Sequence, residues 1–263
     1  MSDPSFTGER LHAGRELFQL DLARHQVAYE FARGYLGSTP GSGSNWVLDL
    51  GCGSGYGTAS LAQESAWVAG LDRVPPDAAN RRARGHFVRA DLDRAPPFAP
   101  DSFDLVMSFQ VIEHLEDPTR YLATIAELLR PDGLALITTP NLLTSDGVNP
   151  YHVHEYDAGE LAECLQSRFG AVEMRGVGAC ATVRDALEAR SRRIRRIVRL
   201  DPLRLRERLP RGLVEWLFAR LALLVRRQAK PHEAGGEASW RDFPVGPADD
   251  RCLDLLAICR QPR

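Results

Sequence analysis

The chain has 263 residues, of which 44% are hydrophobic, and its formal net charge is −2 at pH 7. This length suffices for one complete α/β domain and an additional segment. Five scattered cysteines without a CxxC pair argue against a disulfide-bonded domain and indicate buried thiols in a reducing compartment. The first residues contain no apolar signal region, and the longest apolar stretch, 213–225, is too short to span a bilayer. We therefore expect a cytoplasmic protein.

Residues 1–44 are expected to form a helical cap before the main domain. Between positions 13 and 36 the apolar residues recur at roughly helical spacing, which predicts a helix there. The run GSTPGSGS at 37–44 consists of turn-forming residues and separates this helix from the first predicted strand.

The most informative motif is a glycine-rich loop between a strand and a helix. The strand is WVL at 46–48, the loop follows as DLGCGSG at 49–55, and the helix is predicted to begin at Tyr56. Glycines at alternate positions let the backbone turn tightly and approach a ligand closely. The helix start then offers N–H groups that have no partner within the helix. An ordinary strand-to-helix turn is the alternative interpretation.

Acidic residues end the next two predicted strands. Asp72 ends the apolar run 67–72 and lies 21 positions after Gly51, where nucleotide-binding βαβ units place a carboxylate that binds ribose. A third strand, 86–91, ends in Asp91, and a fourth, 103–109, continues into QVIEHL. Either acid could instead cap the helix that follows it.

Helices and strands alternate through the rest of the chain. Helices are predicted from Asp117 to about residue 129 and over 157–168, the second with an aspartate N-cap. Strands are predicted over 134–140, 171–177 and 253–259. Because the last strand lies about 75 residues beyond its predecessor, we interpret 180–250 as an insertion that is helical to about residue 230 and a loop thereafter.

Taken in this order, VLDLGCGSG, GLD, RADL and FDLVMSFQVIEHL resemble the class I methyltransferases that use S-adenosylmethionine. The resemblance spans about residues 45–175. It implies an α/β, Rossmann-like fold with a seven-stranded sheet that is mostly parallel and has an antiparallel last strand. The chain then divides into an N-terminal helical cap (1–44), the α/β core (45–179), an arginine-rich helical insertion (180–250) and the final strand of the core (251–263).

The resemblance also implies which residues contact S-adenosylmethionine. The glycine loop would line its methionine and ribose portions, with Asp49 beneath the loop holding the loop amides. Asp72 would bind the ribose hydroxyls, Asp91 would meet the adenine amino group, and Leu92 would contact the ring. The backbone at 109–110 would face the sulfonium. The full set of expected contacts is Asp49, Gly51, Cys52, Gly53, Gly55, Asp72, Arg73, Asp91, Leu92, Phe109 and Gln110.

Three histidines are candidates for a catalytic base. A sulfonium is already a strong electrophile, so the protein mainly aligns the reactants and supplies a base where the acceptor must lose a proton. His114 follows the fourth strand, while His152 and His154 follow the fifth, so all three belong to the carboxyl edge of the sheet. Histidines with a purely structural role are the alternative. Among the three we favour His114 and His152.

No metal is expected, although QVIEHL resembles the EVIEHL segment of quinone-pathway O-methyltransferases and the ExxEHH pattern of small-RNA 2′-O-methyltransferases. Some of those enzymes hold a divalent ion. Here Gln110 replaces the first acid, and Leu115 stands where the second histidine would be. Glu113 and His114 alone would suit Mg²⁺ poorly, because this ion prefers oxygen ligands. The same differences argue against an RNA substrate.

The opening of the chain resembles a second motif. FTGER at 6–10 and RHQVAYEFA at 24–32 are loosely similar to the TGER…HxxRYxFA opening of bacterial methyltransferases from glycan and natural-product pathways. In such enzymes this segment closes over cofactor and acceptor. The resemblance therefore makes Arg10, His25 and Tyr29 candidate acceptor-binding residues, and Tyr151, beside the later histidines, is a fourth.

The insertion carries the charge asymmetry of the chain. Residues 184–230 hold fourteen arginines and one lysine against five acids, so the remainder is acidic. Because the insertion leaves from the carboxyl end of the sixth strand, it is predicted to cover the substrate mouth. A lid packed on the core, a homodimer interface, and contact with lipid head groups or an anionic substrate remain open. Nucleic-acid binding is disfavoured because few aromatic residues could stack on bases.

These observations predict an S-adenosylmethionine-dependent methyltransferase that acts on a small-molecule acceptor. We expect methylation at oxygen of a sugar, a natural product, or a quinone-like or lipid-linked intermediate. The alternatives are an N-methyltransferase that acts on an amino group and a cofactor-binding partner or regulator without catalysis.

Overall fold

The computed structural model describes residues 19–36, 45–63, 67–82, 84–92, 94–147, 149–198 and 238–263. Predictions for Arg10, for the start of the N-terminal cap and for the arginine-rich residues 199–230 lie outside these ranges. None of the helices within them is long and apolar enough to cross a membrane.

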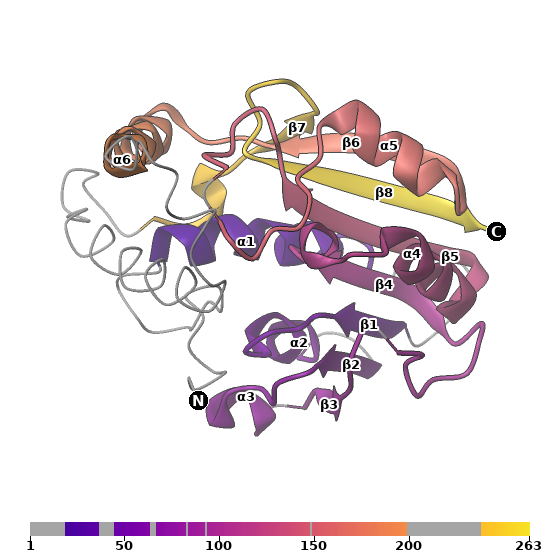
Figure 1. Ribbon diagram of the computed structural model, residues 1–263. Coiled ribbons are helices and arrows are strands. Elements are labelled where there is room, and N and C mark those ends of the chain that lie inside the picture. Colours follow the sequence, from indigo (N-terminus) through magenta and orange to yellow (C-terminus); the bar gives the residue numbers. More distant parts are fainter. Residues whose placement is uncertain are drawn as a thin grey trace.

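An eight-stranded sheet forms the centre of the described structure, in the order β3-β2-β1-β4-β5-β8-β6-β7 (Figure 1). Strands β1 to β5 run parallel to one another, and β8 lies antiparallel between β5 and β6. This confirms the predicted mostly parallel, Rossmann-like sheet with an antiparallel last strand. The strands are β1 (Trp46–Leu50), β2 (Trp67–Asp72), β3 (His86–Arg89), β4 (Phe103–Phe109), β5 (Leu129–Pro140), β6 (Phe169–Val177), β7 (Val245–Pro247) and β8 (Asp254–Pro262).

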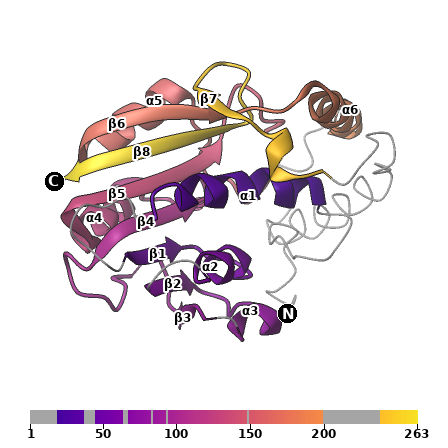
Figure 2. The ribbon, with the colours of Figure 1, turned by 180° about the vertical axis from the view of Figure 1, so that it is seen from behind.

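Helices cover both faces of the sheet (Figure 2). On one face α4 and α5 bury residues such as Ile125 and Leu161, and on the other α1, α2 and α6 bury residues such as Val27 and Val183. Every residue of β4 is consequently buried, which explains why five of its seven residues are apolar, with Asp104 and Ser108 as the buried polar exceptions. The helices are α1 (Gln19–Arg33), α2 (Tyr56–Leu61), α3 (Ala78–Arg81), α4 (Pro118–Leu128), α5 (Ala158–Gln166) and α6 (Ala181–Val198), with short 3₁₀ turns η2 (Ile112–His114) and η4 (Trp240–Asp242).

The largest departures from the sequence-based expectation concern β5 and β7, whereas the bounds of β1, β3, β6 and β8 shift by three residues or fewer. β5 begins at Leu129, five residues before the predicted start at 134, and its register shifts where RPDG at 130–133 lies between two paired positions. The turn signal of RPDG therefore marks an irregularity within the strand. The additional strand β7 pairs with the edge of β6, within a segment predicted to be a loop. Its three residues are too few to show alternation, and its proline is tolerated at a sheet edge.

The predicted insertion begins and ends at one place on the carboxyl edge of the sheet. The Cys180 N–H donates to the Asp242 carbonyl at 2.8 Å, and the Gly178 N–H donates to the Pro244 carbonyl at 2.9 Å. Helix α6 is its first element, in agreement with the predicted helix, and residues 199–237 lie outside the described part of the chain. The wider division of the chain into cap, core and insertion stays a prediction.

Candidate functional site

The strand order reverses between β1 and β4, which are parallel neighbours although β2 and β3 follow β1 in the chain. In open α/β sheets, ligands bind outside the carboxyl ends of the strands at such a point. The glycine loop follows β1 there, and Gln110 follows β4. The fold therefore brings together the two segments that the sequence assigned to the methyl donor.

The glycine loop wraps around the end of β2. Gly51 has φ 79°, and a Cβ atom at this position would lie 2.5 Å from Cγ2 of Val111 in the β4 loop. The N–H groups of Gly51 and Cys52 donate to the Leu71 carbonyl, at 2.8 and 3.1 Å. Both the conformation and the close approach require glycine, so the loop can lie directly against the end of β4.

Asp72 lies against this loop, and its predicted contact with the ribose hydroxyls stays a prediction. Its carboxylate accepts hydrogen bonds from the N–H groups of Gly53 and Val74, both at 2.9 Å. Arg73 and Asp91 are exposed and Leu92 is half-buried; they follow β2 and β3 at the same edge of the sheet. Their contacts with an adenosyl group stay predictions.

The role predicted for Asp49 is wrong. The loop amides of Gly51, Cys52 and Gly53 are held by β2, whereas the buried Asp49 carboxylate accepts from the hydroxyls of Thr58 (2.6 Å) and Tyr29 (3.1 Å). Burial raises the pKa of Asp49 to about 6, and the two hydroxyl hydrogen bonds oppose this rise. Asp49 thus joins α1 and α2 to β1 beneath the site.

His25 and Tyr29 lie over the end of β4. The Tyr29 ring is 5.0 Å from Phe109 and contacts Gly57, where a Cβ atom would approach the ring to 2.0 Å. His25 Nδ1 is hydrogen-bonded to the Tyr56 hydroxyl. Burial lowers the pKa of His25 to about 4, against the opposing influence of the Asp254 charge. His25 is therefore neutral at physiological pH, and the Tyr29 hydroxyl is already bonded to Asp49.

Glu113, His114 and His152 form a cluster of polar side chains beyond the end of β4. Glu113 is fully buried; its Oε2 accepts from Thr139 at 3.0 Å, whereas Oε1 has no hydrogen-bond partner among the described residues. Burial raises the pKa of Glu113 to about 8, while His152 and Thr139 lower it. The rings of His114 and His152 are 5.0 Å apart, and His114 Nδ1 lies 3.0 Å from the Tyr151 carbonyl oxygen. Tyr151 thus contacts the site through its backbone.

His152 is oriented by a carboxylate that sequence reasoning missed. Its Nδ1 is 2.6 Å from Glu155 Oε1, and its Nε2 is 2.7 Å from the Asn149 amide nitrogen. Burial would raise the pKa of Glu155, but hydrogen bonds from His152 and Ser145 outweigh it and lower the pKa. A negative Glu155 holds the Nδ1–H tautomer of His152 in place.

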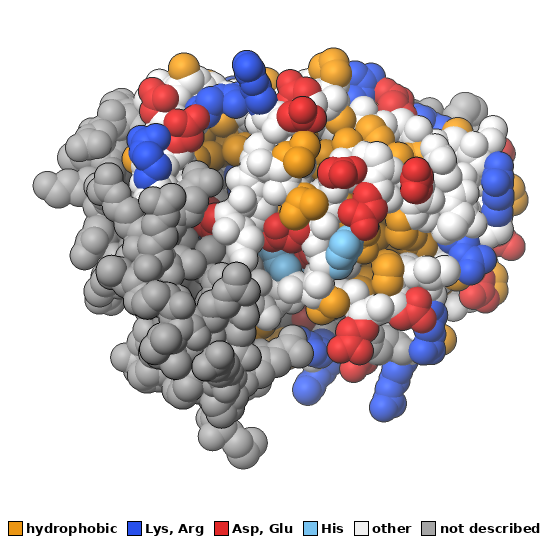
Figure 3. Space-filling model, turned by 45° about the horizontal axis from the view of Figure 1, so that its top comes forward, with side chains coloured by type: hydrophobic (Ala, Val, Ile, Leu, Met, Phe, Trp, Pro, Cys, Tyr) orange, Lys and Arg blue, Asp and Glu red, His pale blue; other side chains and the backbone are white. Residues whose placement is uncertain are grey.

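The structure does not bring His154 to this group. His154 is exposed, its Nε2 lies 2.6 Å from Glu160 of α5, and its ring contacts Tyr156 at 4.6 Å. Histidine side chains on this face of the molecule lie among acidic and apolar side chains (Figure 3). Among the exposed apolar residues are Leu142, Leu143 and Val153, from the loop that also carries His152.

Glu113, His114 and His152 could together offer ligands to a metal ion. One ligand atom from each lies within 4.8 Å of the others. Two imidazoles and one carboxylate suit a transition metal better than Mg²⁺. Both ring nitrogens of His152 are already hydrogen-bonded, however, so the residues fit an ion only after His152 and Asn149 rearrange.

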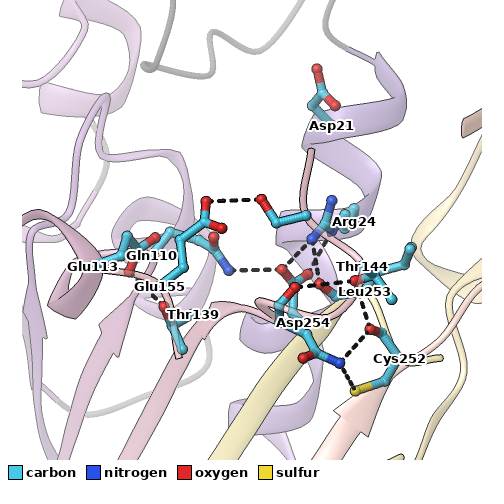
Figure 4. Close-up of polar contacts among 12 residues, drawn as sticks. Asp21, Arg24, Gln110, Glu113, Thr139, Thr144, Glu155, Cys252, Leu253 and Asp254 are labelled. Carbon is cyan, nitrogen blue, oxygen red and sulfur yellow. Dashed lines mark hydrogen bonds and ion pairs between the residues drawn. The ribbon is translucent and has the colours of Figure 1, made fainter. Parts of the chain in front are cut away.

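A further polar group joins α1 to the ends of β4 and β8 (Figure 4). Arg24 donates from Nε to Asp254 Oδ2 at 2.6 Å and from Nη2 to the Leu253 carbonyl at 2.8 Å, and Nη2 also contacts Oδ1 of Asp254. Gln110 Nε2 donates to the same Oδ1 at 3.2 Å. Arg24 and Asp254 are 230 positions apart, and no local pattern in the sequence signals their pairing.

Comparisons with known proteins agree with this geometry. A family model described as "Methyltransferase domain" matches residues 48–137. The protein named "Probable S-adenosylmethionine-dependent methyltransferase MT3114" of Mycobacterium tuberculosis is 35% identical over 191 residues, which cover 69% of this chain and 67% of that protein. "Ubiquinone biosynthesis O-methyltransferase" of Cereibacter sphaeroides is 33% identical over 129 residues, covering 47% of this chain and 52% of that protein.

The chain thus spans between about half and two thirds of the length of these relatives. Among solved structures, a SAM-dependent methyltransferase from Archaeoglobus fulgidus superposes with a TM-score of 0.54 at 16% identity, over 92% of this chain and 96% of that chain. This likeness concerns the fold.

Proposed function

Since the chain belongs to the S-adenosylmethionine-dependent methyltransferases, we propose that it transfers the methyl group of this cofactor to an oxygen atom of a small-molecule acceptor. One observation carries the proposal. The glycine loop, Asp72 and the end of β4 converge where the strand order reverses, and His114 and His152 lie just beyond. A donor site and a proton acceptor are then neighbours on one edge of the sheet.

His114 is the proposed base. The carbonyl oxygen of Tyr151 can only accept a hydrogen bond, so Nδ1 of His114 carries the proton and Nε2 keeps its lone pair. An acceptor hydroxyl at this position would give its proton to Nε2 while its oxygen bonds to the methyl carbon. The bond between that carbon and sulfur breaks, and the sulfur keeps the electron pair. Bound S-adenosylmethionine supplies the electrophile, so the residues need only align the acceptor and take its proton.

His152 is the proposed partner of His114. Its ring is 5.0 Å from that of His114, and the carboxylate of Glu155 fixes its orientation. The negative charge of Glu155 reaches His114 only through His152, to which Glu155 is bonded, and it favours a protonated imidazole in this pair. His154 is assigned no role in the reaction, because its side chain is turned to α5.

The surroundings favour an acceptor that is partly apolar. Leu142, Leu143 and Val153 expose 46%, 56% and 48% of their surface on the loop beside the histidines. A quinone-like ring or a lipid-linked intermediate would cover this surface, and the name of the Cereibacter sphaeroides relative supports transfer to oxygen. Four expectations stay predictions. They are contact of 184–230 with lipid head groups or an anionic acceptor, formation of a homodimer, the lack of nucleic-acid binding and a cytoplasmic location.

Replacement of His114 tests the assignment of the base. We expect His114→Ala to reduce turnover by about 100-fold or more, because general-base assistance is lost. Calorimetric affinity for S-adenosylhomocysteine should remain close to that of the wild type. His154→Ala is the matched control and should leave both quantities unchanged. A greater loss of cofactor affinity than of turnover in His114→Ala would remove His114 as the base, and unchanged turnover would favour an amino acceptor.

The acceptor itself can be found with labelled cofactor. The protein and S-adenosylmethionine that carries a labelled methyl group are incubated with an extract of the source cells, and the label is located by mass spectrometry. Label on oxygen of a small molecule supports the proposal, whereas label on nitrogen identifies the alternative. Cofactor binding without any transferred label would leave a binding protein or regulator.

A further inference from the structure

Gln110 has a backbone conformation that non-glycine residues rarely adopt. Its φ is 57°, in the left-handed region, where a residue with a Cβ atom is strained. The other two non-glycine residues with positive φ among those described, Asp101 and Gln261, lie at the opposite edge of the sheet. Strain of this kind persists only where surrounding contacts hold it, and it is concentrated at functional sites. The contacts that hold Gln110 are therefore informative.

Asp254 provides the side-chain contact of Gln110. The Gln110 backbone N–H donates to the Thr138 carbonyl at 2.9 Å, and its side-chain Nε2 donates to Asp254 Oδ1 at 3.2 Å. Asp254 is 4% exposed and lies at the start of β8, where the antiparallel strand meets the carboxyl edge of β5. A buried carboxylate needs cationic or hydrogen-bonding partners, and Arg24 supplies them.

Arg24 fixes the carboxylate from the side of α1 (Figure 4). Two of its nitrogens contact the two oxygens of Asp254, in a bidentate arrangement that leaves the carboxylate little rotational freedom. Burial alone would lower the pKa of Arg24, but Asp254 outweighs it and raises the pKa. The ring of the next residue, His25, faces the Phe109 ring edge-on, with the centroids 6.5 Å apart. Arg24 and His25 of α1 thus lie against the end of β4, Arg24 through Asp254 and His25 through its ring.

We infer that Arg24 and Asp254 are positioning residues that hold the Gln110 backbone against the sulfur of the bound cofactor. The inference rests on the proposed function, because only a cofactor bound at the reversal of the strand order places its sulfur beside the end of β4. Gly51 supports this placement, since its Cα lies close to the Val111 side chain, one residue beyond Gln110. Neither Arg24 nor Asp254 need touch the cofactor to act in this way.

The test compares two ligands that differ only at the sulfur. S-adenosylmethionine carries a methyl group and a positive charge there, and S-adenosylhomocysteine carries neither. We expect Asp254→Asn to change the ratio of their calorimetric dissociation constants by about fivefold or more, equivalent to one misplaced hydrogen bond. A substitution that only destabilises the fold would weaken the binding of both ligands by the same factor and leave the ratio of their dissociation constants unchanged.

Asp104→Asn is the matched control. Asp104 is also a buried aspartate that pairs with an arginine, Arg130, at 2.5 Å, and it accepts a further hydrogen bond from the Trp46 N–H at 2.9 Å. It lies at the start of β4, at the opposite edge of the sheet. We expect it to lower thermal stability without changing the ratio. An equal change of the ratio in both variants would overturn the inference.

Two further variants separate positioning from folding. Gln110→Met removes the hydrogen bond to Asp254 but keeps the Arg24–Asp254 pair, and it should change the ratio as Asp254→Asn does. The double variant Gln110→Glu with Asp254→Asn exchanges the carboxylate and the amide across the contact, and it should restore the wild-type ratio. A wild-type ratio in both single variants would disprove positioning. A wild-type protein that binds neither ligand would instead disprove the proposed function.

Discussion

The proposed cofactor site depends on the conformation of the glycine loop, in which Gly51 tolerates no side chain. Its φ of 79° and the 2.5 Å approach of a Cβ atom to Val111 add strain and a steric clash. We expect Gly51→Ala to lower the free energy of unfolding by about 1–3 kcal/mol and affinity for S-adenosylhomocysteine by about 100-fold. Chemical denaturation and calorimetry measure the two effects.

Gly147 provides the control for Gly51. Its φ is 63°, and no atom lies within 4 Å of a Cβ atom built on it. Gly147→Ala should therefore lower the free energy of unfolding by only about 1 kcal/mol, because alanine is strained in the left-handed conformation. Affinity for S-adenosylhomocysteine should stay unchanged. Combining Gly51→Ala with Val111→Ala removes the clash and should recover part of the lost affinity. If the double variant binds no better than Gly51→Ala, close contact between the loop and Val111 is not what the site requires.

His25 gives the site a defined dependence on pH. Its folded-state pKa is about 4, below the ordinary value of 6.5, so the unfolded chain binds the extra proton between these values. Its contribution to stability is fully present above pH 6.5 and is lost as the pH falls towards 4. We expect the stability difference between wild type and His25→Gln to shrink by about 2–3 kcal/mol over this range.

Denaturation at several pH values measures that difference directly. Asp49, whose pKa is raised to about 6, changes stability in the opposite direction over nearly the same range. Its contribution is common to both proteins and cancels when they are compared. A stability difference that stays constant between pH 6.5 and 4 would show that His25 is not buried as a neutral side chain.

Local patterns predicted the loop residue and the strand-end acid that are expected to contact the cofactor. Gly51 and Asp72 were recognisable because the loop needs glycine and the strand end needs a carboxylate at a fixed spacing. The partners of Asp49 were not, since Tyr29 and Thr58 reach it from two helices. The pairing of Arg24 with Asp254 was not predicted for the same reason, because contacts between distant segments leave no periodic pattern in the local sequence.

At the scale of elements, the buried strands were the most predictable. β2 and β4 have the predicted bounds because their apolar runs end sharply, in Asp72 and before Gln110. The start of α5 was also predictable, because the Asp157 side chain accepts from the Glu160 N–H at 2.9 Å as an N-cap does. β7 was not, because its pairing with β6 depends on the sheet edge and hardly on its own three residues.

Helix α1 shows what an element contributes beyond its residues. The sequence predicted a helical cap whose His25 and Tyr29 would bind the acceptor. In the structure α1 connects three parts of the sheet edge: Tyr29 bonds to Asp49 of β1, the His25 ring faces Phe109 at the end of β4, and Arg24 bonds to Asp254 at the start of β8. Asp21 extends these contacts to α6 through Arg190, at 2.7 Å. The helix therefore joins the cofactor edge to the beginning of the insertion.

At the level of the whole molecule, we expect that the insertion can be deleted while the chain keeps its affinity for the cofactor. Its ends meet where the Cys180 N–H donates to the Asp242 carbonyl at 2.8 Å, so a short glycine–serine linker can replace 181–239. The free energy of unfolding of this variant should be lower by about 2 kcal/mol, because Val183 is no longer present to fill the core. Affinity for S-adenosylhomocysteine should change little, since the glycine loop, Asp72 and Gln110 are held by β2, β5 and β8.

Methyl transfer by the same variant tests whether the insertion forms part of the acceptor site. The insertion leaves from the carboxyl edge of the sheet, which also carries the histidines, so we expect transfer to the acceptor identified with labelled cofactor to fall by about 100-fold. Turnover close to that of the wild type would show that 181–239 serves another purpose, such as an interface. A large loss of S-adenosylhomocysteine affinity in a variant that keeps its circular dichroism would place part of the cofactor site in the insertion.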